Sequence, residues 1–271
     1  MSISANLVKE LREKTGVGMM DCKKALEHSD GNFEKAVVYL REKGMATATK
    51  KSDRSTHEGR VFIAVSADQK SGSIVEINCE TDFVSNNEAF LVFGQLVAQQ
   101  VLSQGISDME QLQKSQFSGQ PFATHLSESI LKLGENIAVK HIERIQSPGS
   151  LGSYVHMNGK IGVLVNFSSS VTEEIGRDIA MHIAAISPLY VSKEAVPESE
   201  VAKERDIIKN QSLNEGKPEA VLEKVVAGKL AKFFKDICLI EQPFVKDSDK
   251  TVGQILGEKT SVVQFVRYAL G

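Results

Sequence analysis

The stretch Ile74-Val75-Glu76-Ile77-Asn78-Cys79-Glu80-Thr81-Asp82-Phe83-Val84 decides the fold, because it predicts a strand that leads directly into a helix. Apolar and polar residues alternate from Val75 to Glu80, which is the period of two expected of a strand with one buried face. The next residues, Ser85-Asn86-Asn87, all suit a helix N-cap, and an apolar run follows at 89–102. Residues 81–84 are therefore expected to form a tight connection between strand and helix.

This connection holds an acid beside an aromatic, Asp82 and Phe83. Such connections are where a rigid scaffold presents functional side chains. The residue types leave two interpretations open. Either Phe83 fills the core next to a capping acid, as the usual burial of Phe favours, or the pair is a probe offered to a partner.

The residues on either side of this stretch predict a mixed layer of strands and helices. Residues 59–66 alternate as a strand, and the turn at 68–72 joins them to the central strand as a hairpin. Helices are expected at 107–116 and at 121–132, the second ending at Gly134. A third extended segment is expected at 137–145.

The same order of elements then recurs. Residues 154–157 predict a strand, Asn158-Gly159 is a strong hairpin signal, 161–166 predict the partner strand, and 173–186 predict an amphipathic helix. The connection in this second copy, residues 167–171, has no acid next to an aromatic. Since a hairpin can join a helix without such a pair, the difference favours the probe interpretation of Asp82 and Phe83.

The N-terminal residues predict three short helices, the first capped by Ser4 and all finished by about residue 43. A bundle this small is marginal alone, which suggests a docking role. Met19 and Met20 are interpreted as core filler rather than as a binding surface. Residues 44–58 lose apolar periodicity and are interpreted as a linker, in which Lys50-Lys51 is a solvated charged pair.

Residues 188–232 are rich in charge and predict two helices, at 198–213 and from 219 onward, joined at Gly216-Lys217-Pro218. Their apolar positions form only a narrow seam, so we expect an antiparallel helical hairpin that projects from the body. Extended segments are expected at 237–240 and 244–246, a helix capped by Thr251, and a last strand at 261–269.

Composition excludes several classes of protein. Lys and Arg number 32 against 35 Asp and Glu, a net charge of -3, so no overall positive field exists to hold nucleic acid. The three cysteines are widely separated, which argues against a disulfide framework and a zinc site and fits a reducing cytosol. The sequence shows no signal-peptide pattern and no apolar run of about 18 residues, so we expect a soluble, cytoplasmic protein without membrane contact.

No constellation of residues typical of an enzyme occurs. The nearest phosphate-loop candidate, residues 253–260, has the wrong glycine spacing and an acid inside the loop. His182 lies among apolar residues and is interpreted as a satisfied helix residue rather than as a ligand. His156 alternates with its apolar neighbours and is either a surface strand residue or a partner contact.

Two longer motifs resemble those of one family. Asn-Cys-Glu-Thr-Asp-Phe-Val at 78–84 and Leu-Arg-Glu-Lys-Thr-Gly-Val-Gly-Met-Met-Asp-Cys-Lys-Lys-Ala-Leu at 11–26 are similar to the two signatures of bacterial translation elongation factor Ts. Shorter matches at 161–165, 180–182, 216–218, 242–245 and 251–254 extend the resemblance over nearly the whole chain.

The resemblance implies a function without covalent chemistry. A member of this family would be a guanine-nucleotide exchange factor that binds elongation factor Tu carrying GDP and promotes GDP release, with no cofactor of its own. Phe83 would wedge into the partner while Asp82 disturbs its Mg²⁺ site. The positions that the resemblance marks for partner contact are Lys23 in the N-terminal module, Thr81, Asp82, Phe83, Val84, Leu133, Gly134 and His156 in the body, and Val245 near the C-terminal end.

The resemblance also implies an organisation. The expected fold is α+β, with a three-helix ubiquitin-associated-like module and linker (1–55), a core subdomain N (56–146), a core subdomain C in two parts (147–187 and 233–271), and a helical hairpin of the dimerisation type (188–232). That hairpin implies a homodimer, or a heterodimer or heterotetramer with the partner. Lys246 and the lack of the family's further C-terminal helix after Gly271 weaken the expected C-terminal contacts. The alternative is a non-catalytic adaptor that binds another partner through its three-helix module.

Overall fold

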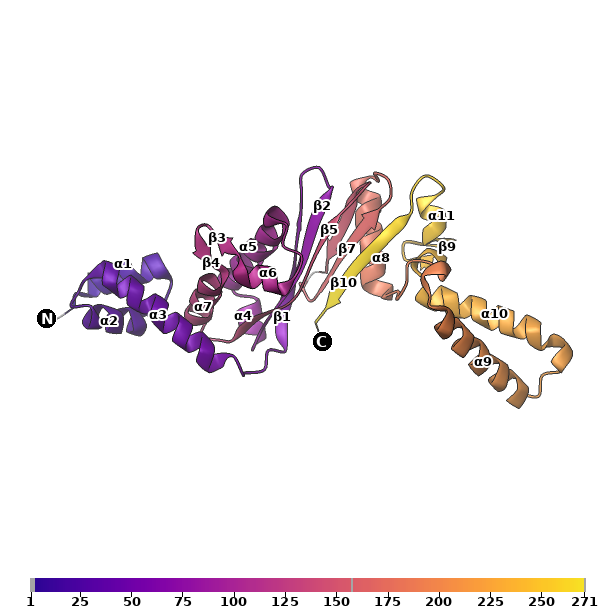
Figure 1. The fold of residues 1–271 in the computed structure, drawn as a ribbon, viewed down its shortest axis with the longest axis horizontal. Coiled ribbons are helices and arrows are strands. Elements are labelled where there is room, and N and C mark those ends of the chain that lie inside the picture. Colours follow the sequence, from indigo (N-terminus) through magenta and orange to yellow (C-terminus); the bar gives the residue numbers. More distant parts are fainter. Residues whose placement is uncertain (1–2, 157, 271) are drawn as a thin grey trace.

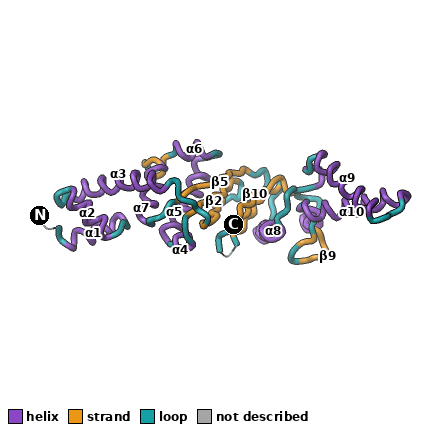
Figure 2. The backbone as a smooth tube through the Cα atoms, turned by 90° about the horizontal axis from the view of Figure 1, so that it is seen from below, coloured by secondary structure: helices purple, strands orange, loops and turns teal. Residues whose placement is uncertain are grey.

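The computed structural model of the chain describes residues 3–156 and 158–270 and shows a mixed α+β protein of elongated shape. The N-terminal helices lie at one end, the two three-stranded sheets with their helices occupy the middle, and a helical hairpin projects at the opposite end (Figure 1). The view turned by 90° shows the same succession along the long axis (Figure 2). The predicted α+β class is therefore confirmed.

The N-terminal bundle consists of α1 (Ala5–Thr15), α2 (Met19–His28) and α3 (Phe33–Lys51). The predicted cap Ser4 accepts a hydrogen bond from the backbone N–H of Leu7, and Asn32 caps α3 through the N–H of Lys35. A small core of apolar side chains joins the three helices. Its buried members are Val8, Leu11, Val17, Cys22, Ala25, Leu26, Ala36 and Leu40.

Two predictions about this region were wrong. Helix α3 continues through most of the expected linker to Lys51, because Gly44 lets it approach α7: a Cβ at Gly44 would lie 3.2 Å from the carbonyl oxygen of Ser127. Met19 and Met20 are 44% and 63% exposed, so they do not fill the core. Val17, only 5% exposed, fills the core just before α2 begins.

The first sheet has the order β1-β2-β5, with β1 (Glu58–Val65), β2 (Ser71–Cys79) and β5 (Ile137–Gln146) all antiparallel. Its outer face is covered by α5 (Glu88–Gln104) and α7 (Phe122–Leu133), which share a large apolar core with it. Between these helices the chain forms α6 (Met109–Lys114) and a short hairpin of β3 (Gln116–Phe117) and β4 (Gln120–Pro121).

The second sheet has the order β10-β7-β6, with β6 (Leu151–Val155), β7 (Ile161–Phe167) and β10 (Val262–Ala269). Helix α8 (Glu173–Ile186) covers its outer face. Gly152 and Gly176 allow this close packing, since a Cβ at Gly152 would lie 2.5 Å from the carbonyl oxygen of Gly176. Strand β6 ends at Val155, one residue before His156, and the predicted strand position 157 lies outside the described residues.

The two sheets face each other, which corrects the expectation that the central strand β2 has one buried side. Val75, Ile77 and Cys79 do lie in the core under α5 and α7. Ile74 points the other way and is fully buried between the sheets, against Leu164 of β7. Alternation within one strand could not reveal that the second sheet covers its other face.

The helical hairpin is formed by α9 (Glu198–Asn214) and α10 (Glu219–Ile237), so α10 extends beyond the expected boundary at 232. Its buried seam is as narrow as predicted. The buried side chains are Ile208, Leu222, Val226 and Leu230. The 3₁₀ turn η1 (Lys193–Ala195) precedes the hairpin.

The chain between the hairpin and the last strand is less extended than predicted. It forms a 3₁₀ turn, η2 (Leu239–Glu241), and a small ladder of β8 (Pro243–Phe244) and β9 (Asp247–Thr251). Helix α11 (Val252–Leu256) begins at the predicted cap, where Thr251 and Gln254 form a capping box. 

Candidate functional site

The connection after β2 is a single helical turn, α4 (Asp82–Ser85), which we call the Phe83 turn. Thr81 caps it, and its side-chain oxygen accepts from the backbone N–H of Val84. The Phe83 side chain is 84% exposed, whereas Val84 is 8% exposed and belongs to the core under α5. The interpretation of Phe83 as a core residue was therefore wrong.

Hydrogen bonds within the turn hold Asp82 and Phe83 outward. The carbonyl oxygen of Asp82 accepts from the Ser85 hydroxyl at 3.0 Å and from the Asn86 side-chain amide at 2.7 Å. Ser85 is buried together with Val84. The buried side of the turn, with Val84 and Ser85, therefore anchors it, and Asp82 and Phe83 lie on the exposed side.

A pair of carboxylates ties this turn to the loop after α7. Glu135 accepts three hydrogen bonds: from the backbone N–H groups of Glu80 (3.1 Å) and Thr81 (3.0 Å) at Oε2, and from the Thr81 hydroxyl (2.6 Å) at Oε1. In return, Glu80 Oε1 accepts from the backbone N–H of Asn136 at 2.7 Å and from Arg54 at 3.4 Å. We call this reciprocal set the carboxylate clasp.

Arg60 of β1 links the Phe83 turn to a third loop. Its Nε donates to the carbonyl oxygen of Ser85 at 2.8 Å, and its Nη2 donates to the side chain of Asn86. The same arginine lies against the loop between β6 and β7, where a Cβ at Gly159 would lie 2.9 Å from Arg60 Cδ. The backbone N–H of Val61 also donates to the carbonyl oxygen of Gly159 at 2.8 Å.

These links bring six of the predicted site positions to one end of the sheets: Thr81, Asp82, Phe83, Leu133 and Gly134 through Glu135, and His156 through the Gly159 loop. Gly134 is exposed, and its carbonyl oxygen accepts from Lys51 Nζ at the end of α3. His156 is exposed too, and its Nδ1 lies 3.3 Å from the Tyr154 hydroxyl. Val84 belongs to the same turn but is buried, so it anchors the cluster from inside.

The remaining two predicted positions lie elsewhere. Lys23 is exposed on α2 in the N-terminal bundle, where its Nζ lies 3.7 Å from Glu27. Val245 is 46% exposed and directly follows β8. Its neighbour Lys246 forms a 2.6 Å ion pair with Asp178 of α8.

His182 is satisfied inside the protein, as predicted. It is fully buried, its Nε2 lies 3.0 Å from Gln242 Oε1, and its Nδ1 accepts from the backbone N–H of Val245 at 3.2 Å. Since Nδ1 is an acceptor, the ring is neutral with its proton on Nε2, and burial lowers the pKa of His182. The histidine thereby fixes the segment that carries Val245.

Negative charge gathers behind the Phe83 turn. Burial raises the pKa of the Cys79 thiol to about 12, and the charges of Glu135, Glu58 and Asp82 add to the shift. The thiol is therefore protonated, and it donates to the carbonyl oxygen of Thr81 at 3.1 Å. Cys79 supports the turn as a hydrogen-bond donor rather than as a nucleophile.

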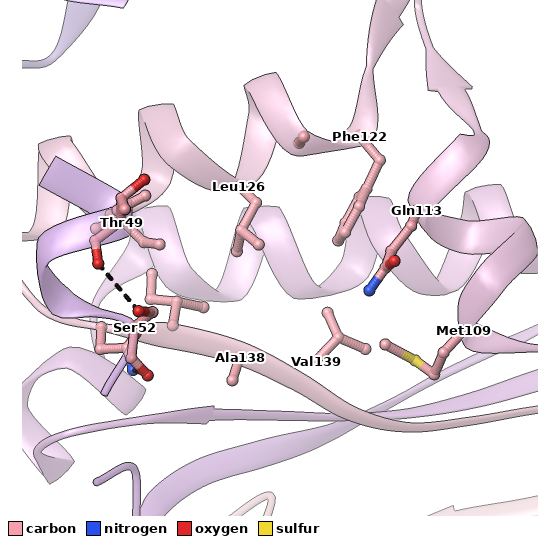
Figure 3. A pocket seen from close by; sticks show the side chains of 13 residues that line it. Thr49, Ser52, Met109, Gln113, Phe122, Leu126, Ala138 and Val139 are labelled. Carbon is pink, nitrogen blue, oxygen red and sulfur yellow. Dashed lines mark hydrogen bonds between the residues drawn. The ribbon is translucent and has the colours of Figure 1, made fainter. Parts of the chain in front are cut away.

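A separate apolar pocket of about 610 Å³ lies between the end of α3, α7 and β5 (Figure 3). Leu126, Phe122 and Val139 point into it, with Thr49 and Ser52 at one side. Its lining includes none of the predicted site residues. Within the described ranges, no group of three His, Cys, Asp or Glu side chains is placed to hold a metal ion.

Two residues important for the cluster were missed by the sequence analysis, Glu135 and Arg60. Both act through contacts between residues far apart in the chain, 54 positions apart for Glu135 and Thr81. Neither stands in a periodic or motif pattern of its own. Only the fold could bring them next to the Phe83 turn.

Most of the cluster lies within the part of the chain that one family profile matches. The sequence profile described as "Elongation factor TS" matches residues 80–271, which begins at the clasp residue Glu80. The chain belongs to the elongation factor Ts family. 

Relatives in the elongation factor Ts family align along the whole chain. "Elongation factor Ts" of Clostridium botulinum (strain Alaska E43 / Type E3) is 46% identical over 282 residues, which cover 99% of this chain and 93% of the relative. The protein of the same name from Nautilia profundicola (strain ATCC BAA-1463 / DSM 18972 / AmH) is 46% identical over 286 residues, covering 100% and 93%. 

Membership confirms the predicted function. Elongation factor Ts is a cytoplasmic factor of translation elongation that exchanges nucleotide on elongation factor Tu, and it is not an enzyme. The family carries no cofactor of its own. As a separate finding, none of the helices in the described part of the chain has the length and apolar character needed to cross a membrane.

Proposed function

We propose that the Phe83 turn is the part of this protein that drives GDP from elongation factor Tu. Phe83 inserts into the partner, and Asp82 disturbs the partner's Mg²⁺ site. In GTPases the bound nucleotide depends on a phosphate loop and on Mg²⁺ held by oxygen ligands, so small displacements of these groups weaken binding strongly. 

The exposure of Phe83 carries this proposal. A phenylalanine that is 84% exposed on a turn whose next two residues are buried gains little from folding. Aromatic side chains of this kind are typical anchors of protein interfaces. Asp82 lies beside it on the exposed side of the turn and adds a negative charge that a partner's metal ion would sense.

The exchange itself follows from linkage. A protein that binds nucleotide-free elongation factor Tu more tightly than the GDP form must weaken GDP binding by the same factor. Leu133, Gly134 and His156 would add contacts around the Phe83 turn. Lys23 and Val245 would add contacts at the two ends of the elongated body. Val84 contributes by anchoring the turn, because its own side chain is buried.

The proposed organisation follows the resemblance. Helices α1–α3 form a ubiquitin-associated-like docking module (1–55), and the exposed Met19 and Met20 support a binding role for it. The core consists of two related hairpin-plus-helix units, subdomain N (56–146) and subdomain C (147–187 with 233–271). In each unit a helix, α5 or α8, packs on a hairpin, β1-β2 or β6-β7.

The helical hairpin (188–232) serves self-association in this proposal, giving a homodimer or a heterotetramer with two partner molecules. This role is supported by apolar side chains that lie outside the buried seam and are exposed to solvent. Ile207, Leu213 and Val221 are 40%, 46% and 44% exposed on α9 and α10.

The proposed function is tested by the release of fluorescent GDP from elongation factor Tu in stopped flow. The wild-type protein must accelerate release, and adding excess GDP must dissociate the complex of the two proteins, since the coupling is reciprocal. A complex that GDP does not dissociate would contradict exchange by linkage.

A further inference from the structure

We propose that Glu135 is a positioning residue for the Phe83 turn: its carboxylate fixes the backbone just before α4 and thereby the direction in which Phe83 leaves the protein. The inference rests on the proposed function of that turn. It adds Glu135, whose side chain accepts hydrogen bonds from Glu80 and Thr81 and acts through Thr81.

The first step is that Phe83 cannot fix its own direction. With 84% of its surface exposed, the side chain has few contacts within the protein. Its orientation is therefore inherited from the backbone of the turn. That backbone is set where Thr81, in an extended conformation (φ −130°, ψ 159°), caps the helical turn.

The second step is that Glu135 holds this cap. Three donors within Glu80 and Thr81 converge on the two oxygens of one carboxylate, at 3.1, 3.0 and 2.6 Å. A carboxylate accepts at both oxygens and donates at neither, and hydrogen bonds to an ionised acceptor are stronger than neutral ones. A glutamine has the same shape but is neutral: its carbonyl oxygen could accept from the two backbone N–H groups and its NH₂ group could donate to the Thr81 hydroxyl, so the charge-assisted hydrogen bonds would be lost.

The third step is that the clasp connects two proposed contact segments. Leu133 ends α7, Gly134 caps it, and Glu135 is the next residue; Glu80 in return accepts from the backbone N–H of Asn136. Asn136 also donates to the carbonyl oxygens of Ser52 (3.3 Å) and Arg54 (2.9 Å), just after α3. The clasp therefore sets the Phe83 turn, the Gly134 loop and the end of α3 relative to one another.

The test compares Glu135→Gln with a matched control, Glu110→Gln, which alters an exposed glutamate paired with Lys114 on α6. In the free protein, amide hydrogen exchange at Glu80 and Thr81 should quicken roughly tenfold or more in Glu135→Gln and stay unchanged in the control. GDP release from elongation factor Tu should slow roughly tenfold, because misplacing a working group by a small distance is costly.

A double variant distinguishes an effect of Glu135 through Phe83 from an independent structural effect of the same substitution. If Glu135 acts through Phe83, then Glu135→Gln combined with Phe83→Ala should release GDP no more slowly than Phe83→Ala alone. Two independent defects that multiply would overturn the inference. So would a normal release rate in Glu135→Gln together with a defective Phe83→Ala.

A second variant covers the case in which Glu135→Gln does not fold. Glu135→Asp keeps the charge but shortens the side chain, so it should also quicken amide hydrogen exchange at Glu80 and Thr81 and slow GDP release. Unchanged hydrogen exchange and unchanged GDP release in this variant would contradict the inference. A wild-type protein without any effect on GDP release would overturn the proposed function and this inference together, an outcome distinct from the failure of Glu135 alone.

Discussion

Phe83 and Val84 are neighbours in the chain, yet the first is 84% exposed and the second 8% exposed. The helical turn that contains them divides one short motif into an outward probe and an inward anchor. The side chain of Val84 stabilises the fold, because it is part of the core under α5. The side chain of Phe83 adds little to the stability of the fold and is available to contact a partner.

Val84→Ala should therefore destabilise the protein. Two buried methyl groups are lost, and at about 0.8 kcal/mol for each the free energy of unfolding should fall by roughly 1.5–2 kcal/mol. Urea melts of the variant and the wild type measure this difference. An unchanged midpoint would show that the turn is not anchored through Val84.

Asp82→Ala should slow GDP release in Mg²⁺, with an unchanged melt because the side chain is exposed. In a chelator the defect should shrink, since a residue that works by disturbing the metal site then has nothing left to disturb. Release rates of fluorescent GDP with and without chelator measure both effects. Equal defects in the two conditions would rule out the metal role of Asp82.

Shortening the helical hairpin should alter self-association without unfolding the body. Replacing residues 204–228 by a short linker removes most of the buried seam and the exposed Ile207, Leu213 and Val221. It keeps the base, where Tyr190 donates to Glu200 and Lys193 pairs with Glu241 at 3.1 Å. Sedimentation should give a lower mass, and GDP release should persist. Loss of the folded body would contradict a projecting hairpin.

Stability should fall on mild acidification because of His182. Burial lowers its pKa in the folded protein, so below about pH 6.5 the unfolded chain binds a proton that the folded protein resists. The stability that neutral His182 contributes is complete above the pKa of this residue in the unfolded chain, and it is lost as the pH falls toward its lower pKa in the folded protein. Melts of wild type and His182→Gln between roughly pH 5 and 7 should diverge, with the variant the less dependent on pH. If the stabilities of the two proteins changed with pH in the same way, His182 would be excluded as the cause of the pH dependence.

Much of the fold was predictable because its signals are local. The caps Ser4 and Thr251 mark helix starts that the structure confirms, and Gly134 ends α7 as expected. Of the three candidate caps at 85–87, the structure selects Asn87 for α5. The span 173–186 is α8 without any change of boundary. 

Two of the failures involve contacts between distant segments. Helix α3 runs past its apolar stripe because Gly44 packs on α7, and the second face of β2 is covered by another sheet. Phe83 is exposed although phenylalanine is usually buried. Residue type favoured the core for this side chain, whereas the comparison between the two hairpin copies and the family resemblance both argued for the surface.

The most direct measurement is GDP release from elongation factor Tu by Phe83→Ala, paired with its urea melt and with the control Leu189→Ala, another exposed apolar residue at 68%. Loss of an interface anchor of roughly 2 kcal/mol should weaken the partner's binding about thirtyfold and slow release, while the melt stays at the wild-type midpoint and the control behaves as wild type. A wild-type release rate in Phe83→Ala, or a free energy of unfolding lowered by several kcal/mol, would contradict the account.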